Sequence, residues 1–447
     1  MFDTKEQQSL PQRIAAIRAE IADIDRTLSC AERSDSITEF DKLLSGCTAA
    51  QAKLTADLAK ERRTERAARG LSKKEQDAGI PLEIGLARRC SHHKGNQHLG
   101  FAQALDEDMP HTLDRLVTGD LTEWRATLLV RETACLSRED RRIVDRRLCS
   151  DPTTLAGKGD KQIAAAALAI AIELDTEALV RRARKATNDR CVTSRPAPDT
   201  MAYVTALLPV KQAVTVHATL MRDAAAVVAA GGDDRTKAQI MADLLVERVT
   251  GLSTATAVPM TVNIVISDEA LLGTKPAAAE VPGYGPIPAD LVKHWLHDTD
   301  ATIELRRLYA NPTTGALTAM ESKSRCIPKG MLRMTRFRDR TCRTPWCDAP
   351  IKHGDHPKSV AQGGDTTYEN SAGLCEACNY AKEADGWSTT LDQRIPGELH
   401  SYTVTTPTGH QHTSTAPPLP TPLPLPRNRI DAWFPTKRVH LEYIEAA

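Results

Sequence analysis

Four cysteines in the C-terminal third of the chain stand in two close pairs whose spacing suits a metal ion. Cys342 and Cys347 form the first pair, and Cys375 and Cys378 form the second. Two thiolates on one tight turn can reach the same ion at about 2.3 Å, and four thiolates leave no open coordination position. We therefore predict a structural Zn²⁺ site. The alternative is a set of four unrelated buried cysteines.

Residues suited to phosphodiester hydrolysis lie within and just after this frame. His356 is the expected general base, because imidazole near neutral pH can take a proton from an attacking water. Asp355 offers a hard oxygen ligand of the kind that Mg²⁺ and Mn²⁺ prefer, and Asn379 offers a second, neutral one. Asn370 is expected to fix the loop and orient His356. The pattern thus predicts a catalytic Mg²⁺ or Mn²⁺ site.

The geometry of a strand leaves open a second choice for the two residues that bind the catalytic metal. Side chains alternate along a regular strand, so His353 and Asp355 would share one face while His356 points away. Either the strand ends or bulges at Asp355, or His353 and Asp355 are the metal pair.

Basic residues gather just before and within the cysteine frame. The chain has a formal net charge of zero, so attraction to nucleic acid must be local. Between Lys323 and Cys347 the only acidic residue is Asp339, and such a strip attracts phosphates. The residues predicted to bind nucleic acid are Arg333, Arg336, Arg338, Arg340, Arg343 and Lys382. For Arg333, Arg336 and Arg340 the alternative is a solvated helix face.

The elements that must position these residues are mainly helical. Aromatic residues make up only 4% of the chain, and Ala and Leu are abundant, which favours helix. We predict a helical hairpin over residues 1–70, broken near Ser34–Ser36, and a mostly helical domain with a few strands over 71–310. A segment rich in proline is expected over 405–447, extended in the polyproline manner.

Several segments of the sequence resemble those of a known protein family. CRTPWCDAP at 342–350, HGDH at 353–356 and LCEACNYAKEADGW at 374–387 look like an HNH nuclease of the ββα-metal type with a zinc knuckle, which would occupy 325–390. Together with LARRCSHHKGNQHLG at 86–100, LTEWRATLLVRETACLSREDR at 121–141 and VPGYGPIP at 281–288, they resemble the actinobacterial HNH proteins often called thirteen-E-twelve repeat proteins. Those proteins pair this nuclease with an N-terminal helical domain of unknown function.

The resemblance implies a role for each motif position. The first His of the HNH name falls on His356, the Asn falls on Asn370, and the last His falls on Asn379, which departs from the eponymous motif. Pro357 stands where an aliphatic residue commonly follows the Asp-His pair.

The function that we expect is a metal-dependent endonuclease acting on DNA. One alternative is a zinc-stabilised module that binds nucleic acid without cutting it, because Asn379 and Pro357 have degraded the site. Another is a repeat-derived protein that forms oligomers through its N-terminal helices and carries a vestigial nuclease. We expect a cytoplasmic protein without a membrane partner, because the longest apolar run that we identify, Ile163–Ile172, is about half of the roughly 20 residues that a span needs.

Overall fold

The computed structural model describes residues 8–24, 26–251, 264–267, 270, 278–281, 284–298, 304–306, 327–392, 398–419 and 440–442. The chain divides into two compact units, each made of two separate stretches of sequence. The first contains residues 1–54 and 101–176, and the second contains 55–100 and 177–447. One long helix contributes to both units, and the domain limits predicted from the sequence at 70 and 310 stay predictions.

That helix is α2, which runs over Cys30–Ala68 after the shorter α1 at Leu10–Ala22. The predicted break near Ser34–Ser36 is wrong, because α2 passes through it without interruption. Its start is fixed by a capping box, in which the Glu32 backbone N–H donates to Ser29 Oγ (3.3 Å) and the Ser29 N–H donates to the Glu32 carboxylate (2.8 Å). The break between the first two helices thus lies between Ala22 and Cys30.

The first unit is a helical bundle. After α1 and the first part of α2, it contains η1 (Ala104–Asp108), α6 (Pro110–Thr118), α7 (Glu123–Thr133), α8 (Arg138–Cys149) and α9 (Asp160–Leu174). Asp145 of α8 is 1% exposed and accepts the backbone N–H groups of His111 and Thr112, which satisfies the first turn of α6. As predicted from composition, this part of the chain is helical.

The second unit begins with the last turns of α2, followed by α3 (Lys73–Asp77), α4 (Ile80–Ala87) and α5 (His92–Gln103). Ala59 of α2, Ile80 and Ile84 of α4, and Leu99 of α5 form one buried cluster. The three helices therefore share a small hydrophobic core.

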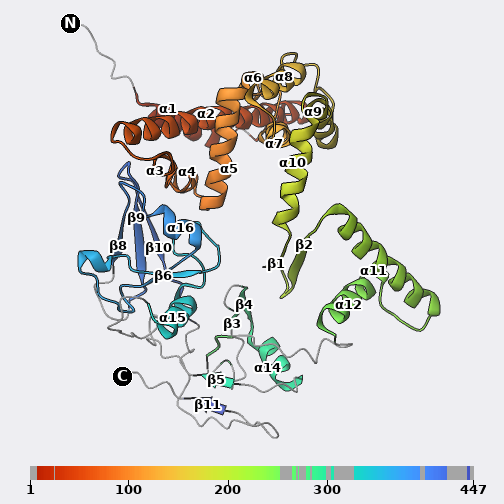
Figure 1. The fold of residues 1–447 in the computed structure, drawn as a ribbon, viewed down its shortest axis with the longest axis vertical. Coiled ribbons are helices and arrows are strands. Elements are labelled where there is room, and N and C mark those ends of the chain that lie inside the picture. Colours follow the sequence, from red (N-terminus) through yellow and green to blue (C-terminus); the bar gives the residue numbers. More distant parts are fainter. Residues whose placement is uncertain are drawn as a thin grey trace. The chain divides into compact units, whose positions relative to one another are not determined.

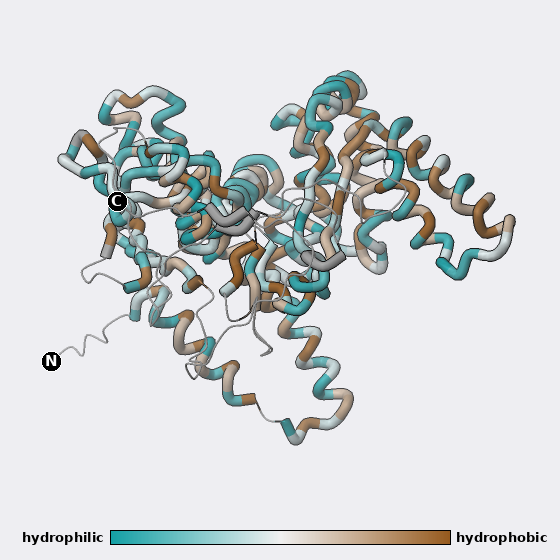
Figure 2. Tube along the Cα trace, turned by 90° about the horizontal axis from the view of Figure 1, so that it is seen from below, coloured by the Kyte–Doolittle hydropathy of each residue, from teal (hydrophilic) through white to brown (hydrophobic). Residues whose placement is uncertain are grey.

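The middle of the second unit alternates helices with short hairpins. Its elements are α10 (Thr176–Ala186), η2 (Thr187–Asp189), β1 (Cys191–Pro196), β2 (Ala202–Leu207), α11 (Val210–Ala230), α12 (Lys237–Thr250), β3 (Ala278–Val281), β4 (Gly285–Pro288), α14 (Ala289–Asp298) and β5 (Glu304–Arg306). Strands β1 and β2 are antiparallel, as are β3 and β4. Hydrophobic and hydrophilic residues are interspersed along the tube in Figure 2.

Helix α11 is long and apolar enough to cross a membrane by length and composition, with 11% of its most apolar window buried. The prediction from the longest apolar run overlooked this helix, because its hydrophobic residues are interrupted by polar ones. Core helices of soluble proteins pass the same test, so the expected absence of a membrane partner stays a prediction.

The C-terminal part of the second unit contains α15 (Lys329–Asp339), β6 (His353–Asp355), η4 (Val360–Gln362), β7 (Ala372–Leu374), α16 (Glu376–Ala381), β8 (Ser388–Asp392), β9 (Ser401–Thr405), β10 (Gln411–Thr415) and β11 (His440–Glu442). Strands β8, β9 and β10 form an antiparallel sheet with β9 in the middle (Figure 1). The segment predicted to be an extended tail from 405 onward therefore begins at the last residue of β9 and contains the sheet strand β10. Residues 420–439, which hold most of its prolines, lie outside the described residues.

Candidate active site and metal centre

The predicted site residues lie on a ββα unit. Strand β6 pairs antiparallel with β7, with His353 opposite Leu374 and Asp355 opposite Ala372. Helix α16 follows β7 directly, after Cys375 as its N-cap residue. A two-stranded hairpin of three residues a strand is marginal by itself, so neighbouring elements must support it.

A buried ion pair supplies part of that support. Arg338, at the end of α15, donates to the carbonyls of Tyr368 (2.8 Å) and Ser371 (2.6 Å) and pairs with Asp339 (2.6 Å). Asp339 in turn accepts the Gly373 N–H of β7 at 2.8 Å. Because both side chains are buried, the pair fixes the approach to β7 and cannot meet a phosphate. This corrects the prediction that Arg338 binds nucleic acid.

Arg343 is also built into the structure. It is 3% exposed and donates to the carbonyls of His400 (2.8 Å) and Ser414 (2.7 Å), which ties the cysteine loop to the sheet. Arg340 donates to the Pro418 carbonyl (2.8 Å) and pairs with Glu280 (3.2 Å). Because Arg343 is buried, its predicted phosphate contact is corrected, whereas the Arg340 side chain is 21% exposed and its phosphate contact stays a prediction.

Two arginines of the predicted strip remain on the surface. Arg333 and Arg336 of α15 are exposed, and the Arg333 guanidinium lies 5.8 Å from the centre of the Phe337 ring. Which arginines of the strip are buried depends on tertiary packing, and the charge pattern of the sequence does not predict that packing. Among the described residues of the predicted basic strip, Lys329, Arg333 and Arg336 are exposed, while Lys323 and Arg325 lie outside the described residues.

The four cysteines converge as predicted. All are buried, and their Sγ atoms lie within 4.8 Å of one another. The Cys347–Cys375 and Cys347–Cys378 sulfur separations are 3.8 and 3.7 Å. Four thiolates about 2.3 Å from one tetrahedral ion are about 3.8 Å apart, whereas a disulfide needs about 2 Å. The cluster therefore fits a metal ion, as in a zinc knuckle.

The surroundings of the cysteines are hydrophobic. The four side chains belong to one buried cluster with Leu374 of β7 and Tyr402 of β9. Leu82 and Leu86 of α4 join the same cluster. Sequence reasoning missed these two leucines, since nothing in their local pattern points to a partner so far along the chain.

Asp355 faces α16. Its Oδ1 lies 3.1 Å from Nζ of Lys382, while its Oδ2 is buried and has no hydrogen-bond partner in the described structure. Burial raises the pKa of Asp355, and the Lys382 ammonium partly offsets this. The Lys382 side chain is 9% exposed, so its predicted phosphate contact is corrected: it is the counter-ion of Asp355.

His356 comes directly after β6, which ends at Asp355. The conflict with strand alternation is therefore resolved, because His356 lies outside the strand. Its Nε2 lies 2.9 Å from the Thr366 hydroxyl, and burial lowers the pKa of His356, which favours the neutral imidazole. His353 instead lies with its ring 6.0 Å from that of Tyr380 on α16.

Asn370 holds the loop between β6 and β7. Its Oδ1 accepts the Lys358 N–H (3.0 Å), and its Nδ2 donates to the carbonyls of Lys358 (2.9 Å) and Asp365 (2.8 Å). A Cβ at Gly364 would lie 1.9 Å from the Lys358 carbonyl oxygen, so this glycine is required by the same close packing. Asn379 is half-buried on α16, three residues before Lys382 and thus on the same face.

Comparison with protein families agrees with this geometry. A family model described as Domain of unknown function (DUF222) matches residues 41–339, and one described as HNH endonuclease matches 340–385. The chain belongs to the DUF222 family. No curated protein and no solved structure matches it. The predicted resemblance, an N-terminal domain of unknown function followed by an HNH nuclease, is confirmed, and the HNH match supports nuclease activity in general.

The boundary between the two matches does not coincide with a structural boundary. Arg338 and Asp339 lie on the DUF222 side, yet they hold β7 of the HNH domain. Leu82 and Leu86 of DUF222 pack against the HNH cysteines. The HNH domain is thus completed by residues of DUF222.

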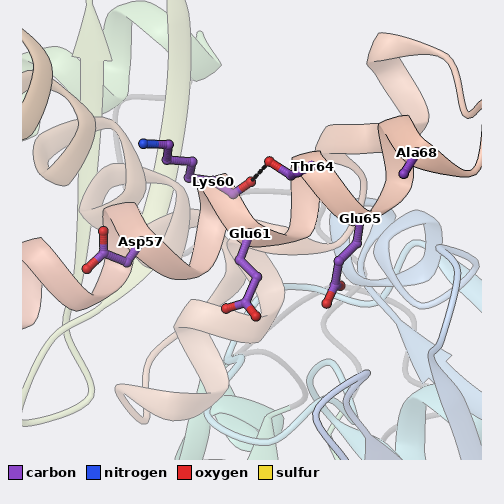
Figure 3. A pocket seen from close by; sticks show the side chains of 6 residues that line it. All are labelled: Asp57, Lys60, Glu61, Thr64, Glu65 and Ala68. Atoms are coloured by element: carbon purple, nitrogen blue, oxygen red, sulfur yellow. Dashed lines mark hydrogen bonds between the residues drawn. The ribbon is translucent and has the colours of Figure 1, made fainter.

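A shallow depression elsewhere carries no comparable chemistry. Figure 3 shows its lining on a single helix, α2, where Thr64 Oγ1 donates to the Lys60 carbonyl. The lining residues are Asp57, Lys60, Glu61, Thr64, Glu65 and Ala68. Since they come from one helix, they cannot enclose a ligand.

Proposed function

We propose that this protein is a metal-dependent endonuclease that hydrolyses DNA phosphodiester bonds. The observation that carries the proposal is Asp355, whose buried Oδ2 has no hydrogen-bond partner among the described residues and which adjoins His356 in the HNH domain. A buried carboxylate oxygen without a partner is costly, so such a site suits a bound cation.

Asp355 would hold a divalent cation through Oδ2, with Asn379 or His353 as the neighbouring ligand. His353 lies two residues before Asp355 on β6, so both side chains face α16, where Asn379 lies. When bound, Mg²⁺ or Mn²⁺ supplies positive charge that stabilises the phosphate and the leaving oxygen. Lys382 positions Asp355 by donating to its other oxygen.

His356 would act as general base. The lowered pKa keeps the imidazole neutral near pH 7, as a proton acceptor must be. In the tautomer whose Nε2–H donates to the Thr366 hydroxyl oxygen, Nδ1 carries the lone pair that would take the proton from the attacking water. Asn370 acts as a positioning residue, because its three hydrogen bonds fix the loop that follows His356.

We further propose that the cysteine cluster holds Zn²⁺ and has a structural role. Four thiolates fill the tetrahedral coordination of zinc, so none of its positions is open to substrate. The ion would join the loop before β6 to the start of α16, and thereby set the helix that carries Asn379 and Lys382.

One observation favours a second candidate function. The Lys382 ammonium already balances the Asp355 carboxylate, as a divalent cation would. A protein in which Lys382 replaces the cation would keep the zinc-stabilised fold and bind nucleic acid without cutting it.

The two candidates are separated by one experiment. Zinc-loaded protein is incubated with linear and supercoiled DNA in separate Mg²⁺, Mn²⁺, Ni²⁺ and Zn²⁺ reactions, and binding is measured in parallel at several salt concentrations. The endonuclease predicts cut product with at least one ion and none in a brief EDTA control. Salt-dependent binding with no product in any reaction would contradict the endonuclease and favour the second function.

A further inference from the structure

Helices α4 and α5 have the form of a helix-turn-helix. The eight-residue α4 (Ile80–Ala87) is followed by four turn residues, 88–91, and then by α5 (His92–Gln103). Two helices joined by a turn of three to four residues make this supersecondary motif, whose second helix enters the major groove of DNA.

The turn is built to reverse the chain sharply. Arg89 adopts a left-handed conformation (φ 55°), and the Cys90 N–H donates to the Gly85 carbonyl at 2.8 Å, which closes α4. Ser91 then caps α5, because its Oγ accepts the Lys94 N–H at 3.3 Å. Both helix ends are therefore satisfied within the four-residue turn.

The two helices are in backbone contact where they cross. A Cβ at Gly95 of α5 would lie 2.1 Å from the Pro81 carbonyl oxygen and 2.8 Å from the Gly85 nitrogen of α4. Only glycine permits this approach. The shared core with Ala59 of α2 adds a third helix, so the motif is a compact three-helix unit.

The exposed side chains of α5 and of the turn before it are of types that bind DNA. His93, Lys94, Asn96 and Gln97 of α5 are exposed, as is Arg89 in the turn. Asn and Gln side chains can pair with adenine edges in the major groove, and Lys and Arg bind guanine or phosphate. Between residues 84 and 105 the sequence has no acidic residue.

The nearest acid on α4 does not weaken this positive face. Glu83 is 4% exposed and pairs with Arg62 of α2 at 3.2 Å. Its negative charge is therefore turned inward and balanced. A helix face with amides, cations and no exposed carboxylate is complementary to the floor and the edges of a DNA groove.

We propose that the α4–α5 unit binds duplex DNA, with α5 in the major groove. Asn96 and Gln97 would meet base edges, while Arg89 and Lys94 would bind phosphates. This gives the DUF222 segment a recognition role beyond the hydrolysis assigned to the HNH domain. The opposite side of α4 packs on the cysteine cluster through Leu82 and Leu86, so the reading helix is anchored on the cutting domain.

The test is a binding measurement on the full chain in a His356→Ala background, so that no probe is cut. Fluorescence anisotropy is recorded with a duplex selected from a random library by this protein, and with an unrelated duplex. We expect Asn96→Ala together with Gln97→Ala to lower affinity for the selected duplex about 5- to 150-fold and to bring it close to that for the unrelated one. Lys94→Gln should weaken binding to both duplexes and reduce the slope of log affinity against log salt concentration by about 1.

Matched controls lie on the neighbouring helix and in the first unit. Lys74→Gln on α3 and Gln51→Ala on α2 remove exposed side chains of the same types, and we expect them to bind as the background protein does. Circular dichroism and metal content verify that each variant is folded. If the α5 variants bind both duplexes as the controls do, the proposal is overturned; single-stranded RNA bound more tightly than either duplex would overturn it too.

This outcome is independent of the proposed hydrolysis. A wild-type protein that cuts DNA while its α5 variants bind unchanged would retain the nuclease and reject the reading helix. A protein that binds DNA through α5 and never cuts it would retain the DNA-binding role of α5 and reject the nuclease.

Discussion

Individual residues of the HNH domain fall into two groups that charge alone does not separate. Arg338 and Arg343 are buried and donate to carbonyls, whereas Arg333 and Arg336 are exposed on the neighbouring turns of α15. The sequence predicted all four to bind nucleic acid, with a solvated helix face as the alternative for Arg333 and Arg336. The difference arises from contacts with residues 368–371, 400 and 414, which only the folded chain brings close.

The Arg338–Asp339 pair gives the first prediction. Replacing Arg338 by Met leaves the Asp339 carboxylate buried without its main partner, and should lower the free energy of unfolding by about 3–5 kcal/mol. Arg336→Met, the control on the exposed face, should change it by less than about 0.5 kcal/mol. Urea denaturation of the wild type and the two variants measures both changes in the free energy of unfolding. Equal stability for the two would show that the buried pair does not support β7.

His400 gives a prediction about pH. It is 2% exposed, its Nε2 lies 2.9 Å from the Glu369 carbonyl oxygen, and burial lowers the pKa of His400 to about 3. The unfolded chain binds the proton at a pKa near 6.5, so stability due to His400 is present above that pH and is lost as pH falls.

We therefore compare wild type with His400→Gln between pH 7 and pH 4. The stability difference should fall by about 1.4 kcal/mol for each pH unit below about 6. Chemical denaturation at each pH gives this difference, in which groups common to both proteins cancel. A difference that does not vary with pH would mean that His400 is not held neutral.

At the scale of elements, the ββα unit depends on the cysteine cluster. Helix α16 has only six residues and follows its N-cap residue Cys375, whose Sγ accepts the Cys378 N–H at 3.4 Å. So short a helix is not stable alone. The metal site that we propose would hold its first turn.

Metal removal tests this dependence. We expect one Zn²⁺ per chain by elemental analysis, and expect loss of the ion or Cys378→Ser to abolish the thermal transition of the HNH domain, since structural zinc supplies roughly 10–16 kcal/mol in small modules. Cys191→Ser, at an exposed cysteine outside the cluster, is the control. Zinc-free protein with an unchanged transition would contradict the structural role.

The sequence was most informative about local elements and least about distant packing. The convergence of the two cysteine pairs was predicted correctly, because short spacing within each pair determines its geometry, while the roles of Asp355 and His356 stay predictions. The break predicted near Ser34–Ser36 was wrong because the Ser29–Glu32 capping box was overlooked. The ion pair of Asp355 with Lys382 was missed because it joins β6 to the residue that ends α16, and no local pattern encodes that contact.

At the scale of the whole molecule, segments far apart in sequence make up the second unit. Leu82 and Leu86 of α4 pack with the HNH cysteines, and Arg69 of α2 pairs with Asp385 beyond α16 (3.0 Å). Tyr402 and Val404 of β9 complete the same core. The predicted nuclease domain at 325–390 lacks five of these residues, namely Arg69, Leu82, Leu86, Tyr402 and Val404.

The isolated segment 325–390 should therefore not fold cooperatively, even with zinc. Full-length protein is the reference, and the measurement is calorimetry together with zinc content at equal concentration. Without Leu82, Leu86, Tyr402 and Val404, the apolar surface that they cover on the cysteine cluster would be exposed to water. Each Å² of lost apolar burial lowers the stability by about 25 cal/mol. A fragment that binds one zinc and melts at the temperature of the intact domain would contradict this account.

The central claim is that His356 is the base of a DNA-cutting site, and supercoiled plasmid tests it most directly. Zinc-loaded wild type, His356→Ala and His353→Ala are compared with Mg²⁺ or Mn²⁺, at equal protein and verified fold. We predict nicked or linear product with wild type, a loss of at least about 100-fold with His356→Ala, and a smaller loss with His353→Ala. Cleavage that persists unchanged in His356→Ala would contradict the claim.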